Sequence, residues 1–254
     1  MKVKRYGWVR DEKDERDYLY RARLNKNDIP SRIDLRGLCP PVYEQGKLGS
    51  CSANAVAAAL EYDLIRKRIE PFVPSRLFIY YNERLIWKTT QYDSGSPLRL
   101  ASKALKKYGV CDEILWPYDI RRYKERPERR CYDQAKNYEG MKYERIGRNL
   151  QLMKDCLASG LPFVFGFTAF ESFESDEMAK YGILSMPKKG EKKVGQHAAL
   201  AVGFDDAESV LIARNSWGEK WGDEGYFYVP YQYVLNENLA ADFWAISFAQ
   251  RNKE

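Results

Sequence analysis

An apolar, alanine-rich stretch marks one long buried helix early in the chain. Residues 51–68 contain neither glycine nor proline, and their first half is apolar on nearly every side, which predicts a central helix. Their second half is amphipathic and ends in basic residues, which suit a helix C-terminus. Two further helices are expected at about 97–109, with Ser96 as the cap, and at about 149–159.

The pattern changes after residue 160 to short apolar or alternating runs bounded by Gly, Asp and Pro. Such runs are typical of strands, which we expect at 162–170, 197–204, 210–213 and 225–229. Helices in the first half and strands in the second predict an α+β protein with two lobes, divided near residue 143.

The order of these patterns also suggests a domain organisation. Residues 1–28 are highly charged with scattered aromatics, so we expect an N-terminal extension there. Residues 29–254 are expected to form one domain, with a helical lobe at about 36–142. The β lobe is expected to comprise about 143–254 together with the extended entry stretch 29–35.

Composition places the chain among ordinary globular proteins. It has 254 residues, 44% hydrophobic and 31% charged, enough to bury a large core. No apolar run is long enough to cross a membrane, and the first residues lack the apolar core of a secretory signal. We therefore expect no membrane partner and a cytoplasmic location, with a virion or non-classical export as alternatives.

The distribution of charge and the small number of metal-binding residues argue against nucleic-acid binding and against a metal site. The net charge is +6, but the basic runs 121–130 and 188–193 are interrupted by Glu, Gly or Pro. We interpret them as solvated loops and expect no nucleic-acid partner, because a nucleic-acid module concentrates charge on one face. Five cysteines without a C-x-x-C spacing and a single histidine argue against a metal site, and no cofactor is expected.

Two residues are candidates for nucleophilic chemistry. Cys51 lies at the first turn of the predicted helix, where the helix dipole lowers a thiol pKa. An inert buried cysteine is the alternative. His197 is the one histidine of the chain and can exchange protons near neutral pH. A structural histidine is the alternative there.

Asn215 follows the strand after His197 and is a candidate to orient it. A turn centred near Asp206 would place residues whose numbers sum to 412 opposite each other, as 197 and 215 do. The Asn oxygen could then accept a hydrogen bond from the imidazole. Cysteine, histidine and asparagine together suggest a base that activates a thiol and a third group that orients the base.

Four separated segments carry a family resemblance. They are IPSRIDLR from Ile29, QGKLGSC from Gln45, QHAALAVGF around His197, and NSWGEKWGDEGYFYV from Asn215. In this order they resemble the papain family of cysteine peptidases, in particular microbial or viral members with a short N-terminal extension. The resemblance implies a helical left lobe with a long central helix, an antiparallel barrel-like right lobe and an active-site cleft between them.

The resemblance also implies roles in catalysis. Cys51 would attack the peptide carbonyl and form a thioester acyl-enzyme, with His197 as general base and acid. Asn215 would orient His197, and Trp217 would shield that hydrogen bond from water. The Gln45 side chain and the Cys51 backbone N–H would form the oxyanion hole.

Substrate-binding residues are implied by position in the same way. Gly95 and Ser96 match a glycine pair that binds extended substrate backbone, although a loop ending in a helix cap explains them equally well. Ala198 would border the main specificity pocket, and Gly166 would open another wall of it. Leu48 stands where many relatives have a disulfide cysteine, so that bridge is absent.

The expected function is therefore that of a cysteine endopeptidase acting on a peptide or protein substrate as a monomer. Two alternatives stay open: a catalytically silent relative that binds peptides or a partner, and another Cys–His amide hydrolase or transferase. The extension is shorter than the inhibitory propeptides of the family. We expect Tyr6 and Trp8 to lie over or near the cleft and to restrain activity.

Overall fold

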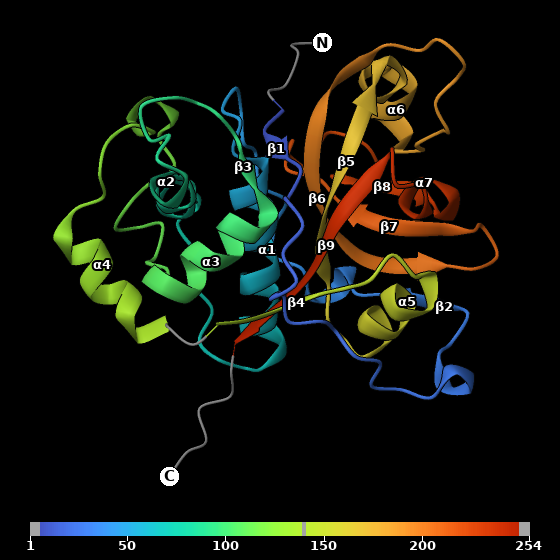
Figure 1. Cartoon of the computed structure of the whole chain (residues 1–254), viewed down its shortest axis with the longest axis horizontal. Coiled ribbons are helices and arrows are strands. Elements are labelled where there is room, and N and C mark those ends of the chain that lie inside the picture. The colour runs from blue at the N-terminus through green and yellow to red at the C-terminus, as the bar shows by residue number, and fades with distance from the viewer. Residues whose placement is uncertain (1–5, 139–140, 249–254) are drawn as a thin grey trace.

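A computed structural model describes residues 6–138 and 141–248. Parts of the predicted extension and of the predicted domain, at 1–5, 139–140 and 249–254, lie outside the described residues. Helices of the first half of the chain gather on one side of the molecule, and a large sheet flanked by shorter helices lies on the other, with the N-terminal chain running between them (Figure 1). The prediction of a two-lobe α+β fold is confirmed.

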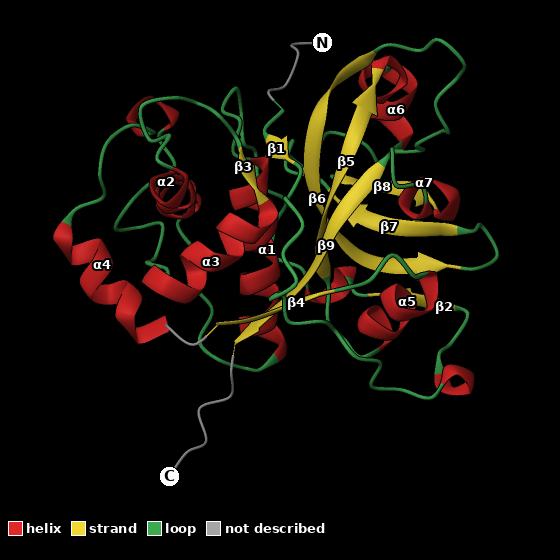
Figure 2. Ribbon diagram, viewed as in Figure 1, coloured by secondary structure: helices red, strands yellow, loops and turns green. Residues whose placement is uncertain are grey.

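Among the described residues, four helices lie between residues 51 and 135 and three between residues 150 and 235; Figure 2 draws them in red. They are α1 (Cys51–Arg66), α2 (Arg76–Trp87), α3 (Leu98–Tyr108), α4 (Arg129–Ala135), α5 (Leu150–Ala158), α6 (Asp176–Tyr181) and α7 (Tyr231–Leu235). Short 3-10 turns occur at Lys26–Asp28, Arg36–Leu38, Ile120–Arg122, Lys136–Tyr138 and Glu171–Glu174.

The long helix α1 is the centre of the molecule. Every residue from Cys51 to Leu64 is buried, and the helix packs against α2 and α3 on one side and against the sheet on the other. Small alanine side chains let these neighbours approach closely. The predicted central helix is thus confirmed, and its first residue lies where the two lobes meet.

Within the described residues, the large sheet has seven antiparallel strands. They are β4 (Met141–Arg145), β9 (Ala240–Phe248), β5 (Phe163–Phe170), β6 (Lys193–Asp205), β7 (Val210–Arg214) and β8 (Tyr226–Pro230) in spatial order, with β2 (Arg32–Asp34) paired to β6. The end strands β4 and β8 do not pair with each other in the described chain, so the sheet is open. All four strands predicted after residue 160 are present, with bounds shifted by up to four residues.

The predicted register between β6 and β7 is wrong. Leu200 lies opposite Arg214 and Ala201 opposite Ala213, after which the register shifts before Gly203. Pairs therefore sum to 414 or 415 rather than 412. The hydrophobic pattern does not reveal this irregularity, and Asn215 lies just beyond the end of β7.

The predicted role of Ser96 as a helix cap is also wrong. Pro97 occupies the N-cap position of α3, and no side chain caps that end. Ser96 belongs instead to β3 (Ser96–Pro97), which pairs in parallel with β1 (Trp8–Val9). The N-terminal chain thus adds a strand to the helical lobe.

Other features of the chain bear on its organisation. The entry stretch forms β2 on the sheet, while the exact bounds of the extension and of the two lobes stay predictions. All five cysteines are free thiols. None of the helices described here combines the length and apolarity needed to cross a membrane.

Candidate active site

Cys51 is the first residue of α1 and is fully buried. Burial raises the pKa of its thiol to about 12, against the opposing effect of the backbone N–H groups of Ala198, Gly7 and Ser52, which face the sulfur. Ala198 comes from β6 and Gly7 from the N-terminal chain. The sulfur therefore lies at a junction of three separate segments.

His197 lies in β6, next to Ala198, and is also fully buried. Its Nε2 is 2.8 Å from Asn215 Oδ1. An amide oxygen only accepts, so Nε2 carries the proton and Nδ1 of the neutral ring is the basic nitrogen. Nδ1 is buried without a hydrogen-bond partner in the described chain. Burial lowers the pKa of His197 to about 4, partly offset by the bond to Asn215.

Asn215 is itself held in place, because the backbone N–H of Ser216 donates to its Oδ1 over 2.8 Å. Aromatic rings then surround the imidazole. Trp217 lies 5.1 Å from it between ring centroids, and Phe167 and Tyr6 lie 5.6 Å and 5.7 Å away. These rings lie against the imidazole beside its bond to Asn215, and the shielding of that bond from water by Trp217 stays a prediction.

Gln45 is fully buried beside the same group. Its backbone N–H donates to the Ser216 carbonyl over 2.8 Å, and its side-chain oxygen accepts from the Ser216 hydroxyl. These contacts orient the amide so that its nitrogen points to the loop before Cys51, where it donates to the Leu48 carbonyl over 2.9 Å. The structure thus brings together Cys51, His197, Asn215 and Gln45.

The N-terminal chain lies directly on this group. Its backbone is fixed at Gly7, whose N–H donates to the Gln196 carbonyl over 3.1 Å and whose carbonyl accepts from the Ser96 N–H over 2.8 Å. One bond goes to the β lobe and the other to the helical lobe. Ser96 therefore binds extended backbone, and here that backbone is the protein's own.

Glycines make this close approach possible. A Cβ added to Gly7 would lie 1.8 Å from the Gly49 carbonyl oxygen. One added to Gly95, at φ +67°, would lie 2.0 Å from the Gly7 oxygen, and one added to Gly195 would lie 2.2 Å from the Tyr6 ring. The surfaces fit too closely for any side chain at these positions.

Trp8 fills a side-chain pocket next to the nucleophile. It is 2% exposed, and a Cβ on Gly166 would lie 1.9 Å from its indole ring. Gly166 therefore opens a wall of this pocket. At the far end the indole N–H donates to Asp242 Oδ2 over 3.2 Å. Asp242 was missed by sequence analysis, because it is placed by a register irregularity between β5 and β9 and by its own positive φ of 60°.

Ser52 and Glu83 form a second contact that the sequence did not reveal. Ser52 follows the nucleophile and donates to Glu83 Oε1 over 2.7 Å, with both residues fully buried. Burial raises the pKa of Glu83 to about 8. Burial thus favours the neutral form of this carboxyl group, whose negative charge would raise the pKa of the Cys51 thiol further.

Comparison with known proteins agrees with this geometry. The family description "Papain family cysteine protease" matches residues 29–241. The chain belongs to the papain family. It is a cysteine-type peptidase, as the four sequence segments predicted.

Relatives of this papain-family chain include viral and bacterial proteins. A peptidase C1-like protein of Acanthamoeba polyphaga mimivirus is 40% identical, over 95% of this chain and 86% of its own length. The crystal structure of xylellain, a cysteine protease from Xylella fastidiosa, is 39% identical with a TM-score of 0.90 and covers 98% of this chain and 99% of its own. Procathepsin L 3 of Tenebrio molitor, at 18% identity and a TM-score of 0.72, shares the fold.

Proposed function

We propose that this papain-family peptidase is an endopeptidase that uses Cys51 as nucleophile and that its own N-terminal segment, residues 6–17, holds it inactive. The observation that supports the proposal is the path of that segment. It passes Cys51 as an extended backbone, with Tyr6 on one side and residues 8–17 on the other. A cleft that accepts chain on both sides of the nucleophile suits cleavage within a peptide.

The chemistry follows from the protonation of the two central groups. Once the segment leaves, water reaches the site and the penalty of burial on the charged forms falls. The Cys51 proton can then pass to His197 Nδ1, and the thiolate attacks the peptide carbonyl to form a thioester. His197 returns the proton to the leaving amine and later takes one from the water that hydrolyses the thioester.

Two further residues assist these steps. Asn215 holds His197 in the tautomer whose Nδ1 is basic, and Trp217 keeps water from their bond. The Gln45 amide and the Cys51 backbone N–H stabilise the oxyanion, and each such donor contributes about 10²–10³ in rate. Neither Gly95 nor Ala198 takes part in proton transfer: they bind substrate beside the thiol.

The N-terminal segment inhibits the enzyme because it buries Cys51 and His197 and so disfavours their charged forms. While the segment is in place, burial raises the pKa of Cys51 and lowers that of His197, so both are neutral at pH 7. Tyr6 closes the site from the other side, since its hydroxyl donates to Glu174 Oε1 over 2.8 Å. The thiolate needed for attack does not form, and substrate has no room.

The experiment is to fold the whole chain and then remove the segment. A site for a sequence-specific protease is placed in the exposed stretch 25–28, the protein is cut and diluted, and hydrolysis of an internally quenched peptide library is followed. We expect cleavage after cutting, and none in Cys51→Ala. A cut protein that a thiol reagent labels at Cys51 but that cleaves no peptide would be a binding protein instead.

The remaining expectations belong to the same proposal. The enzyme acts as a monomer in the cytoplasm, without nucleic-acid or membrane partners. A different Cys–His amide chemistry is the competing activity, and incorporation of an amine into the library peptides without their hydrolysis would establish it.

A further inference from the structure

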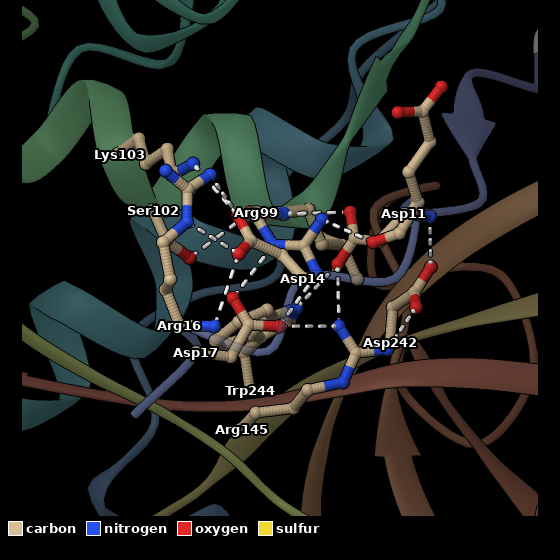
Figure 3. Close-up of polar contacts among 12 residues, drawn as sticks. Asp11, Asp14, Arg16, Asp17, Arg99, Ser102, Lys103, Arg145, Asp242 and Trp244 are labelled. Carbon is tan, nitrogen blue, oxygen red and sulfur yellow. Dashed lines mark hydrogen bonds and ion pairs between the residues drawn. The ribbon is translucent and has the colours of Figure 1, made fainter. Parts of the chain in front are cut away.

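The N-terminal segment is anchored by a group of charged residues (Figure 3). This group borders the Trp8 pocket, because Asp242 belongs to it and accepts from the Trp8 indole. Arg99 comes from α3 in the helical lobe, and Arg145 is the last residue of β4 in the sheet. Between them lie two carboxylates of the segment, Asp11 and Asp17 (Figure 3). Acidic side chains of the segment therefore connect arginines of the two lobes.

Asp17 is bound in a fork. Arg99 donates from Nε over 2.9 Å to one oxygen and from Nη2 over 2.6 Å to the other. Arg145 Nη1 lies 3.3 Å from the second oxygen. Planar two-point contact of this kind is the strong form of arginine–carboxylate binding.

Asp11 occupies a more enclosed site built from three donors of the peptidase body. The backbone N–H of Arg99, in the first turn of α3, donates to Oδ1 over 3.0 Å. The Trp244 indole N–H donates to Oδ2 over 2.8 Å, and Arg145 Nη1 is 3.3 Å from the same oxygen. A backbone amide, an indole and a guanidinium thus converge on one carboxylate.

These donors are held in place by the body of the protein. Both guanidinium groups lie over the Trp244 ring, Arg145 at 5.1 Å and Arg99 at 5.7 Å from its centroid. Arg145 Nη2 also bonds Asp242 Oδ1 over 2.9 Å. The site therefore keeps a framework when the segment is absent.

Charge balance changes sharply when the segment leaves. In the described chain, every side-chain hydrogen bond of Arg99 goes to residues 12–17 of the segment, and its side chain is 7% exposed beneath them. Arg145 loses Asp11 and Asp17 and keeps Asp242. Arg99 and Arg145 then have one carboxylate between them, that of Asp242. One positive charge beside the cleft is therefore left without a partner.

We propose that Arg99 and Arg145, with Trp244, form a binding site for an acidic side chain of the peptide substrate. The proposal rests on the function proposed above, since substrate reaches this site only after the segment leaves. Asp11 is three residues from Trp8, and three residues of extended chain span roughly 10 Å. The preferred substrate therefore carries Asp or Glu three residues from the side chain that enters the Trp8 pocket, on the side away from Cys51.

The test compares two peptides that differ only by Asp or Asn at that position. The enzyme is the folded chain cut within 25–28 and carrying Gly7→Ala, with loss of the segment verified by mass. We expect kcat/KM to be about tenfold or more higher for the Asp peptide, the size of effect that charge-assisted hydrogen bonds give. Arg99→Gln and Arg145→Gln should each bring the ratio close to one, while the Asn peptide is still cleaved.

The control is Arg121→Gln, which removes an arginine of the same charge that pairs on the surface with Asp119. It should keep the full preference. The intact chain carrying Asp11→Asn and Asp17→Asn provides a second enzyme in which nothing has been removed, and it should show the same preference for the Asp peptide.

Two outcomes separate this inference from the function on which it rests. A ratio near one in both enzymes, with the Asn peptide cleaved well, would overturn the acidic site and leave the endopeptidase in place: the arginines would then serve the segment alone. Failure to cleave either peptide, with Cys51 labelled normally, would overturn the proposed function instead.

Discussion

Gly7 and Gly49 lie so close that a Cβ on Gly7 would sit 1.8 Å from the Gly49 carbonyl oxygen. Real Cβ atoms do not approach another atom so closely. Because the contact is with the Gly49 backbone, a shift of main chain would be needed to relieve it. Gly7→Ala should therefore push the N-terminal segment off Cys51. We expect kcat/KM on a short peptide to rise by at least about tenfold. A loss of about 1.4 kcal/mol in the binding free energy of the segment raises the population of the open cleft tenfold.

Gly37→Ala is the matched control for this experiment. A Cβ at Gly37 meets no atom within 4 Å, so that variant should keep the activity of the unchanged chain. Equal activity in Gly7→Ala and Gly37→Ala would contradict an inhibitory segment.

Reagents for thiols should report the same change at Cys51. With the segment in place, the pKa of Cys51 is raised to about 12 and that of His197 is lowered to about 4 by burial. Both groups are neutral between those values, so iodoacetamide should label the unchanged chain slowly from pH 5 to 9. In Gly7→Ala the apparent pKa of labelling should fall, and the rate at pH 7 should rise. Identical pH profiles for the two proteins would argue against shielding of the thiol.

Loss of the histidine and loss of the asparagine should differ in size. With the segment removed, His197→Ala should lower kcat by at least about 10²–10⁴, because no other histidine exists to replace the base. Asn215→Ala should cost less, since the imidazole stays and only its orientation is lost. Asn238→Ala, at an exposed position, is the control. Full activity in His197→Ala would refute the assignment.

Asp155 should matter for stability rather than for chemistry. It is buried in α5 and accepts from the Tyr20 hydroxyl over 2.6 Å and from the backbone N–H groups of Arg23 and Leu24. Asp155→Ala leaves these donors without a partner. We expect the free energy of unfolding to fall on the order of 2–4 kcal/mol in denaturant titration, against little change for the exposed Asp176→Ala. A smaller loss than about 1 kcal/mol would mean that water replaces the carboxylate.

Sequence alone predicted the central helix and the chemistry, because Cys51, His197 and Asn215 stand in distinctive local patterns. It missed α2, whose apolar positions are interrupted by buried Arg84 and Glu83. Their polar contacts come from other parts of the chain: Arg84 donates to the Tyr123 carbonyl, and Glu83 Oε1 accepts from the Ser52 hydroxyl. Polar residues that become buried through long-range contacts look like surface in a local pattern.

The hydrophobic pattern of the sequence also does not predict the register of the strands or which residues pair across them. His197 and Asn215 were expected to meet as directly opposed strand residues, yet Asn215 reaches the imidazole from beyond the end of β7. The prediction that Tyr6 and Trp8 lie over the site agrees with their contacts in the structure. Asp242 could not be found, since its place depends on an irregularity between two strands.

The covalent link between the segment and Ile29 has a kinetic consequence. A tethered occupant stays at a high effective concentration beside the cleft, so a free peptide must exceed that concentration to compete. Cutting the chain turns the segment into a free peptide, and the fraction of it that stays bound then falls as the solution is diluted. After a cut, the fraction of enzyme that has lost its segment should therefore be larger in dilute than in concentrated protein, and the activity per enzyme molecule should rise on dilution.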